Sequence, residues 1–257
     1  MKIVFIGDIV GRTGRNAIKE LLPIIKKEYS PDVIIANAEN AAGGFGLTKN
    51  VAMELFDYGI DCLTMGNHTW DNNDVFNIIN DPRIVRPLNF SPRVAGQGWT
   101  IIEKNGLKLA VINLIGQIFM GPYNSPFMVY DEYIDYILDS SDIVVVDFHA
   151  EATSEKLAFA YYVDGKVACV VGTHTHVQTA DERILTGGTA YITDLGLTGA
   201  SDSVLGMEHK EIIQRFLTQV HQRMKVARGK RQLKGFFVDI CEEDRVAKEI
   251  SRINLNS

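Results

Sequence analysis

The chain has 257 residues, of which 46% are hydrophobic and 23% charged, and its formal net charge is −6. This is the composition of an ordinary globular protein, and it argues against a disordered chain. The length corresponds to one or two domains, and the absence of a repeat or linker favours a single domain over residues 1–257. A chain of this size folds without a metal or disulfide staple, so a bound metal would point to chemistry.

The same counts narrow the expected location and partners. Cys62, Cys169 and Cys241 are odd in number and widely spaced, which favours a reducing cytoplasm over a disulfide framework. No apolar run reaches the length of about 18 residues that a membrane span needs. Asp8 interrupts the N-terminal apolar run too early for a signal peptide. The negative charge offers nucleic acid no broad attraction, so a small anionic substrate would need local cations.

The first third of the chain alternates between two patterns. Three short apolar runs are typical of buried strands, at residues 2–7, 33–38 and 61–65. Helical spacing of apolar residues predicts helices over residues 13–29 and 48–58. Thr48 is the expected N-cap and Gly59 the expected stop of the second helix, whereas Pro23 is expected to kink or divide the first. This β-α-β-α-β order predicts a partly parallel sheet with covering helices.

The remainder of the chain is richer in predicted strands. The turn at Asn105-Gly106 predicts a hairpin between residues 100–103 and 108–113. Further strands are expected at residues 142–148, 167–171, 189–193 and 236–241, and helices at residues 131–138, 154–162 and 209–217. Residues 245–253 are expected to pair with the preceding strand in a closing hairpin, although the same pattern fits a helix equally well.

Metal-capable side chains follow five of these strands. They are Asp8, Glu39, Asn40, Asn67, His149, His174 and His176, with His68 beside them. In open α/β sheets, ligands bind beyond the carboxyl ends of the strands, so we expect these side chains to meet at one edge. Each residue alone would be an ordinary cap or turn residue, but five such strand ends together are poorly explained by chance.

The donor groups in this set favour catalytic metals. Imidazole, carboxylate and amide groups suit zinc, manganese or iron, and a set without cysteine argues against a structural zinc cluster. Seven side chains supply two sites of about four ligands each when one carboxylate bridges the two metals. Two metals about 3.5–4 Å apart are a common device for hydrolysing phosphate esters. The sequence therefore predicts a dinuclear phosphoesterase.

The segments around these residues resemble those of the calcineurin-like metallophosphoesterases, and more closely their YmdB-type branch of bacterial 2′,3′-cyclic nucleotide phosphodiesterases. The resemblance is carried by residues 5–11 (FIGDIVG), 40–43 (NAAG), 64–71 (TMGNHTWD), 147–156 (DFHAEATSEK) and 172–181 (GTHTHVQTAD). It extends over essentially the whole chain. It implies an α/β fold, a four-layer α/β/β/α sandwich in which two mixed β-sheets are flanked by helices, with the metals at the sheet edge.

The resemblance also implies a role for each residue. The implied ligands of the first metal are Asp8, Glu39, Asn40 and His176, and those of the second are Glu39, Asn67, His149 and His174. Glu39 would bridge the two metals, a metal-bridging hydroxide would attack phosphorus, and His68 would be the general acid. The implied metals are two divalent or trivalent ions, iron first and manganese as the alternative. A homo-oligomer is implied as well.

Two departures from the wider superfamily sharpen this resemblance. The common pattern begins Asp-x-His, but Val10 stands in the position of that histidine. Glu39 replaces the usual bridging aspartate, and Asn40 supplies the missing ligand. Both changes are those of the YmdB-type branch. They leave the metal open, because an amide in place of an imidazole makes the first site harder.

The function expected from these features is hydrolysis of small phosphodiesters, with 2′,3′-cyclic nucleotides ahead of 3′,5′-cyclic nucleotides. One alternative is a regulatory protein that binds a nucleotide or RNA at a vestigial metal site. Another is a phosphomonoesterase or an RNA endonuclease that uses the same metals. The complete ligand set and the retained His68 argue against a dead site.

Two further segments allow more than one interpretation. Residues 43–46 form a glycine-rich loop that either approaches a substrate phosphate, with Phe45 stacking on a base, or is simply flexible. A basic run consists of Arg223, Lys225, Arg228, Lys230 and Arg231. It is interpreted as a solvated face, with RNA as the alternative partner, because no aromatic residues interleave it. His209 and His221 lie away from the strand ends and receive no role.

Overall fold

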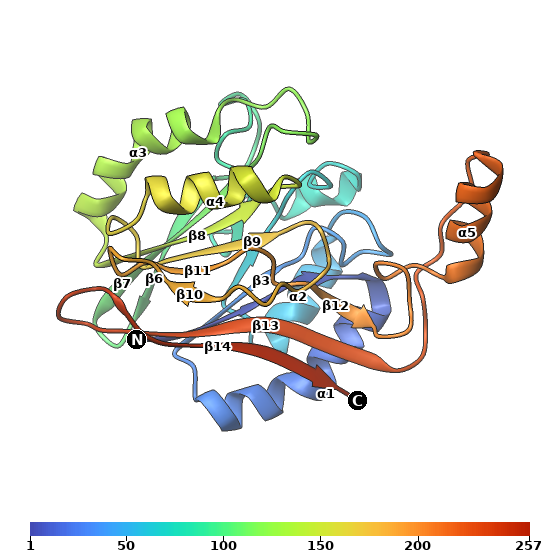
Figure 1. The fold of residues 1–257 in the computed structure, drawn as a ribbon, viewed down its shortest axis with the longest axis horizontal. Coiled ribbons are helices and arrows are strands. Elements are labelled where there is room, and N and C mark those ends of the chain that lie inside the picture. The colour runs from blue at the N-terminus through green and yellow to red at the C-terminus, as the bar shows by residue number, and fades with distance from the viewer.

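Alternate side chains of the first strand enter two different hydrophobic cores. In β1 (Lys2–Ile6), Val4 and Ile6 belong to one core, and Ile3 and Phe5 belong to another. Successive side chains of a strand point to opposite faces, so a strand buried on both faces must be covered on both. The computed structural model describes residues 1–257 and shows what covers them: a second sheet on one face and helices on the other (Figure 1).

The first sheet has eight strands of mixed direction. Their order is β2 (Asp8–Ile9), β12 (Leu197–Ala200), β13 (Arg231–Ile240), β1, β3 (Val33–Asn37), β4 (Cys62–Thr64) and β5 (Ile84–Val85), and β14 (Ala247–Asn256) pairs with β13. Strands β1, β3, β4 and β5 run parallel, whereas β13 is antiparallel to β1. The parallel strands therefore end at the same edge.

The second sheet has six strands and is also mixed. Their order is β10 (Arg183–Ile184), β11 (Ala190–Ile192), β9 (Cys169–Thr173), β8 (Ile143–His149), β7 (Leu107–Ile115) and β6 (Trp99–Lys104). Its central strands run parallel and its two edge strands pair antiparallel to their neighbours. Leu109, Val145 and Val171 of this sheet meet Ile3 and Phe5 of the first in the core between the sheets.

Helices cover the outer faces, so the predicted four-layer α/β/β/α sandwich is confirmed. Two helices, α1 (Gly11–Tyr29) and α2 (Lys49–Asp57), bury Ile18 and Leu55 against the first sheet. On the other side, α3 (Pro126–Ser140) and α4 (Thr153–Tyr162) bury Tyr130 and Phe159 against the second (Figure 1). A short 3₁₀ helix, η1, spans Asn73–Asn77. No helix combines the length and the apolar character that crossing a membrane requires.

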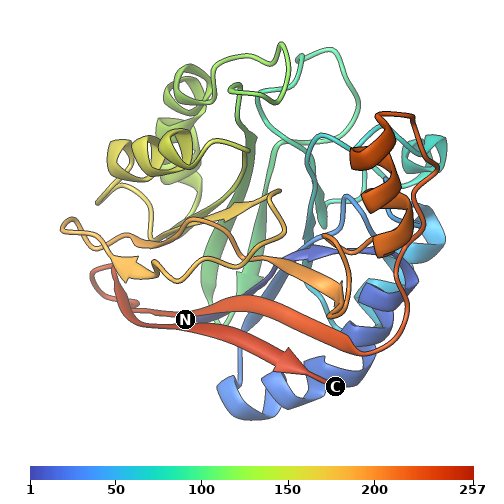
Figure 2. The same ribbon diagram turned by 45° about the vertical axis from the view of Figure 1, so that its right-hand side comes forward.

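The remaining helix, α5 (His209–Thr218), stands apart from the layers. Only Ile212 among its residues is buried. Figure 1 shows α5 projecting beyond the sheets, and Figure 2 shows it beside the same end of the molecule as β12.

Several local predictions are confirmed. Thr48 caps α2, and its Oγ1 accepts a hydrogen bond from the N–H of Val51 at 3.3 Å. Gly59 follows that helix with a φ of 93°. Asn105 and Gly106 both have positive φ and connect β6 to β7, as a tight hairpin turn requires. The closing hairpin is formed by β13 and β14, so the helical alternative for residues 245–253 is wrong.

Pro23 is predicted to kink or divide the first helix, and of these two effects the division is wrong. Pro23 lies inside α1, which continues unbroken to Tyr29. The proline is exposed, whereas Leu22 and Ile25 on either side are buried against the first sheet. The backbone carbonyl that a proline leaves without its helical partner therefore faces solvent, and the apolar contacts of the opposite face keep the helix continuous.

A buried ion pair lies beneath the turn that follows β9. Lys156 of α4 donates hydrogen bonds to Asp194 Oδ2 and to the carbonyl oxygen of Thr173, each at 2.8 Å. Asp194 Oδ2 also accepts from the N–H of Thr175 at 3.0 Å and from its hydroxyl at 2.7 Å. Lys156 and Asp194 are 1% and 0% exposed. The pair therefore joins α4 to residues 173–175 with no contact with water.

The turn that this ion pair supports is strained. His174 and His176 have φ values of 100° and 65°, in the region that favours glycine. Such a backbone costs about 1–3 kcal/mol per non-glycine residue, so it persists only where surrounding contacts hold it. Thr175 lies between these two histidines, and its two hydrogen bonds to Asp194 keep the turn in this conformation.

Replacing Lys156 by methionine should destabilise the protein strongly. The variant leaves the Asp194 carboxylate buried without a cation, which typically costs about 3–5 kcal/mol. Urea unfolding would measure the loss, with Lys104→Met on the exposed end of β6 as the matched control. Equal stability of the two variants would show that the buried pair does not support the fold.

Candidate metal centre

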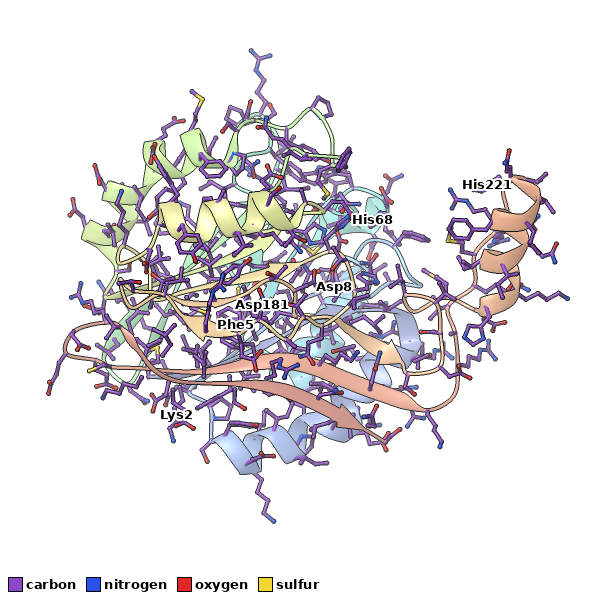
Figure 3. All side chains as sticks on the ribbon, in the orientation of Figure 1. Lys2, Phe5, Asp8, His68, Asp181 and His221 are labelled. Carbon is purple, nitrogen blue, oxygen red and sulfur yellow. The ribbon has the colours of Figure 1, made fainter.

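The predicted site residues lie where strands of both sheets end. Asp8 follows β1, Glu39 and Asn40 follow β3, Asn67 and His68 follow β4, His149 ends β8, and His174 and His176 follow β9. The strands pair in parallel, so their carboxyl ends are neighbours. Asp8 and His68 lie near this end of the sheets in Figure 3, whereas His221 lies beside α5. Glu39, Asn40, His68, His174 and His176 line a cavity of about 520 Å³.

Three of these side chains converge on the His149 imidazole. His149 Nε2 lies 3.2 Å from Glu39 Oε1, 2.9 Å from Asn67 Oδ1 and 3.1 Å from His174 Nδ1. Glu39 comes from the first sheet and His149 from the second, so the group forms only when the two sheets pack. These are the four residues predicted to hold the second metal.

The other predicted ligands form a second group beside Glu39. Asn40 Nδ2 donates to Glu39 Oε1 at 3.0 Å and lies 3.4 Å from His176 Nε2. His176 Nε2 is in turn 3.7 Å from Asp8 Oδ1. The structure thus brings all seven predicted ligand residues together, with Glu39 between the two groups.

Burial and charge shift the pKa values at the centre of the site. Burial would raise the pKa of Glu39, but the charge of His149 and its hydrogen bond outweigh burial and lower that pKa to about 2. Burial would lower the pKa of His149, but Glu39 and Asp8 raise it to about 9. Burial raises the pKa of Asp8 to about 6, whereas burial and the neighbouring His149 lower the pKa of His174 to about 3. The Glu39 carboxylate and the His149 imidazole, 3.2 Å apart, thus each favour the charged form of the other.

The residues present fit a metal site. Asp8 Oδ1 is buried and has no hydrogen-bond partner. A buried carboxylate oxygen without a partner is costly, so this atom is suited to a cation. Glu39, His149 and His174 each offer one ligand atom, and these atoms lie within 4.8 Å of one another. Imidazole and carboxylate donors suit iron, manganese or zinc.

Gly66 explains why the chain can approach these ligands so closely. A Cβ at this position would collide with the imidazole of His149 and the carboxylate of Glu39. With glycine there, the following backbone passes beside the site, and the N–H of His68 donates to Glu39 Oε2 at 2.9 Å. The Gly-Asn-His motif thus places one residue's backbone and two side chains around one carboxylate.

His68 is held by Asp71, a residue for which the sequence predicts no role. His68 Nδ1 lies 2.7 Å from Asp71 Oδ2, and the ring meets Phe45 edge-on with centroids 4.9 Å apart. Because Nδ1 is engaged, Nε2 is the nitrogen left to face a ligand in the cavity. His68 and Asp71 are three residues apart in the Gly-Asn-His-Thr-Trp-Asp motif, and this spacing could have indicated their contact.

Other contributing residues received no predicted role, although Asp147 and Thr173 lie inside the motifs around His149 and His174. Thr173 Oγ1 lies 2.9 Å from His149 Nδ1 and donates to Asp147 Oδ1 at 2.7 Å, so a buried carboxylate orients the imidazole through a hydroxyl. Phe216 of α5 lines the cavity opposite the ligands. These residues are distant from one another along the chain, and only the fold brings them to the site.

Comparison with known proteins identifies the family. The family described as YmdB-like protein matches residues 4–253. The chain is 50% identical over 257 residues to the 2′,3′-cyclic-nucleotide 2′-phosphodiesterase of Bacillus subtilis (strain 168), covering 100% of this chain and 97% of that protein.

Solved structures agree with this match. The crystal structure of a novel phosphatase from Mycoplasma pneumoniae has a TM-score of 0.94 and 38% identity, covering 100% of this chain and 93% of that chain. The NAD nucleotidase of Haemophilus influenzae, with a TM-score of 0.59 and 11% identity over 99% of this chain and 55% of that chain, shares the fold alone. The protein therefore belongs to the YmdB-like family and has the calcineurin-like metallophosphoesterase fold.

Proposed function

We propose that the protein hydrolyses small phosphodiesters, 2′,3′-cyclic nucleotides before 3′,5′-cyclic nucleotides, at a site that holds two metal ions. The observation that carries this proposal is the convergence of Asp8, Glu39, His149 and His174 at one sheet edge, with the His68 imidazole in the same cavity. The 50% identity to the Bacillus subtilis enzyme supports the choice of substrate.

The proposed ligands form two groups that share Glu39. The first metal would be held by Asp8, Glu39, Asn40 and His176, and the second by Glu39, Asn67, His149 and His174. Glu39 Oε1 lies 3.2 Å from His149 Nε2 and 3.0 Å from Asn40 Nδ2, so it stands between the groups as a bridging ligand must. The donor set supports iron, with manganese as the alternative.

The chemistry divides between the metals and the chain. Two bound metals would neutralise the phosphoryl oxygens and lower the pKa of a water molecule so that it can attack. As the water oxygen bonds to phosphorus, one phosphorus–oxygen bond to the ribose breaks, and the departing oxygen takes up a proton. His68 is positioned to donate that proton from Nε2, because Asp71 fixes the ring through Nδ1 at 2.7 Å.

Three further proposals concern the whole molecule: the homo-oligomer rests on the resemblance, the location on the unclustered cysteines, and the single domain on the absence of a repeat or linker. We propose a cytoplasmic location, a homo-oligomer and a single domain over residues 1–257. Fractionation of cells, the molar mass in solution and a single cooperative unfolding transition would test them in turn.

Replacing His68 by alanine should lower turnover of 2′,3′-cyclic AMP by about 10²–10⁴-fold while both metals stay bound. The reason is that the departing ribose oxygen loses its proton donor, whereas the ligand set is intact. Turnover would be measured on protein of known metal content, with a 3′,5′-cyclic nucleotide and a phosphomonoester as comparison substrates. Loss of metal from the variant would instead make His68 a ligand, and an inactive wild-type protein with two metals would contradict the proposed function.

Replacing Asp71 by asparagine should lower the same turnover by about 10–100-fold, less than the loss of His68 itself. An amide can still bond to His68 Nδ1 but lacks the negative charge that favours the doubly protonated ring, from which Nε2 donates. The distinguishing readout is the pH profile, which should move in the variant while KM and metal content do not. A changed KM with an unchanged profile would mean that Asp71 acts on substrate binding.

Replacing Glu39 by glutamine should remove both metals together, because its carboxylate belongs to both ligand groups. Elemental analysis of the purified variant would give metals per chain, with Glu132→Gln on the exposed face of α3 as the control. A variant that keeps two metals per chain would rule out the bridging role.

A further inference from the structure

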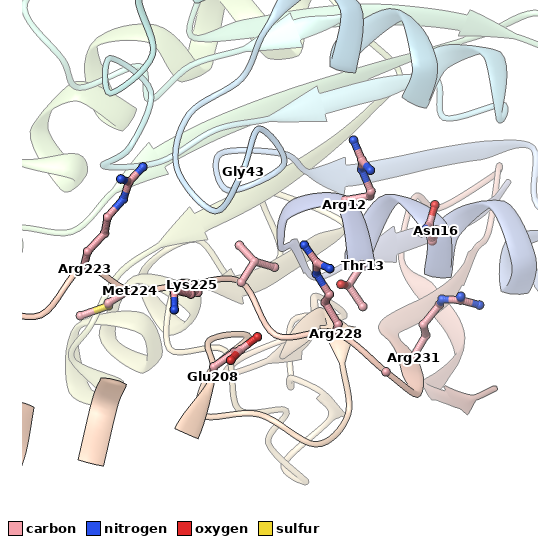
Figure 4. Close-up of a pocket in the computed structure, with 12 residues that line it drawn as sticks. Arg12, Thr13, Asn16, Gly43, Glu208, Arg223, Met224, Lys225, Arg228 and Arg231 are labelled. Atoms are coloured by element: carbon pink, nitrogen blue, oxygen red, sulfur yellow. The ribbon is translucent and has the colours of Figure 1, made fainter. Parts of the chain in front are cut away.

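A second cavity, of about 850 Å³, has five cations among its 12 lining residues (Figure 4). Its charged residues are Arg12, Arg223, Lys225, Arg228 and Arg231, with Glu208 as the single acid. Arg12 comes from the first turn of α1, whereas the other cations belong to the basic run near the C-terminal end of the chain. The run that we interpreted as a solvated face therefore forms a concave surface together with α1.

Three of these cations have no acidic partner. Lys225 pairs with Glu211 at 2.9 Å, and Arg231 pairs with an acidic residue of α1. The side chains of Arg12, Arg223 and Arg228 make no ion pair and no hydrogen bond to the protein, and all three residues are exposed. Guanidinium groups gathered in one cavity repel each other, and they match the geometry of phosphate oxygens. The excess charge is therefore suited to an anion with several phosphates.

The cavity wall is a fixed part of the fold. Thr13 Oγ1 donates to the carbonyl oxygen of Ala227 at 2.7 Å, and Ala227 is only 3% exposed. The N–H of Ala227 donates to the carbonyl oxygen of Gly206, and the N–H of Glu208 to that of Lys225, each at 2.9 Å. The backbone that carries the cations is thus anchored on both sides.

This cavity adjoins that of the proposed metal site. Met224 lines both cavities, and the consecutive residues Gly43 and Gly44 line one each. The metal-site cavity also presents the aromatic rings of Phe45 and Phe216, which are 41% and 81% exposed, whereas the cationic cavity has no aromatic lining residue. Aromatic rings bind unstacked bases, and cations bind the backbone.

We propose that the cationic cavity binds the phosphate backbone of an RNA strand whose 3′ end, a 2′,3′-cyclic phosphate, lies in the metal site. The inference rests on the proposed function and extends it, because a 2′,3′-cyclic phosphate at a chain end exists only in RNA. Backbone contacts without base contacts in the cavity make the binding independent of sequence. The cations of the cavity attract the RNA backbone locally, although the net charge of the chain is −6.

The test compares two substrates in a matched pair of variants. The substrates are 2′,3′-cyclic AMP and a fluorescent RNA octamer that ends in a 2′,3′-cyclic phosphate. The double variant Arg12→Glu/Arg228→Glu should lower kcat/KM for the octamer by about tenfold or more and leave that for the mononucleotide unchanged. The control Lys230→Glu/Lys104→Glu changes the charge equally, with Lys230 in the same segment but outside the cavity lining, and should leave both values unchanged.

A binding measurement keeps the inference testable without catalysis. Fluorescence anisotropy of an octamer that ends in a 3′-hydroxyl would give Kd over a range of salt concentrations. The slope of log Kd against log salt should fall by about 1.4 in the double variant, at about 0.7 for each lost phosphate contact in a single strand. The control should keep the wild-type slope.

Four results would overturn the inference. They are equal octamer binding and cleavage by the double variant, parallel loss of both substrates, a wild-type protein that cleaves only the mononucleotide, and a double variant that loses binding of adenosine triphosphate but not of RNA. The last would make the cavity a site for a free nucleotide. If the metal-loaded wild type cleaves neither substrate, the proposed function fails, and the salt slope still decides whether the cavity binds RNA.

Discussion

The Glu39 carboxylate lies where the ends of the two sheets meet, and the site depends on its burial. It is 1% exposed and contacts the imidazole of His149, the amide of Asn40 and the backbone N–H of His68. A buried carboxylate is tolerated only when cations or donors surround it. Those groups come from three different strand ends, so the site can form only when the two sheets pack against each other. Gly66 is part of it, because a side chain there would fill the space of the ligands.

A second group of buried charges fixes the turn that carries the other two site histidines. Lys156 and Asp194 anchor the turn in which His174 and His176 adopt left-handed backbone. A buried ion pair contributes little to net stability, but breaking one is costly, so it restricts the turn to one conformation. Thr173 connects the same turn to His149. The geometry of the imidazoles is therefore set by contacts beneath the cavity, independently of any ligand within it.

Much of the fold could be predicted from local patterns, and the failures have physical causes. Apolar runs with turn signals located the longer strands, because burial on both faces requires them. The short strands β2, β5, β10 and β12 were missed, since two to four residues carry no periodicity and are defined by their partners. At Pro23 the local signal was strong but was outweighed. Proline disfavours a helix interior, yet the packing of the opposite face of α1 keeps the helix continuous.

By itself, the sequence determined which residues stand at the ends of the strands, and hence the eight residues of the predicted site. Strand period and motif spacing are local properties, and parallel pairing brings such ends to one edge whatever the details of packing. Only the tertiary structure decided what surrounds them. Asp194 and Phe216 contribute through contacts between distant segments, and Arg12 meets Arg228 because the C-terminal segment is anchored to α1. Such contacts depend on how whole layers pack, and no spacing along the chain encodes them.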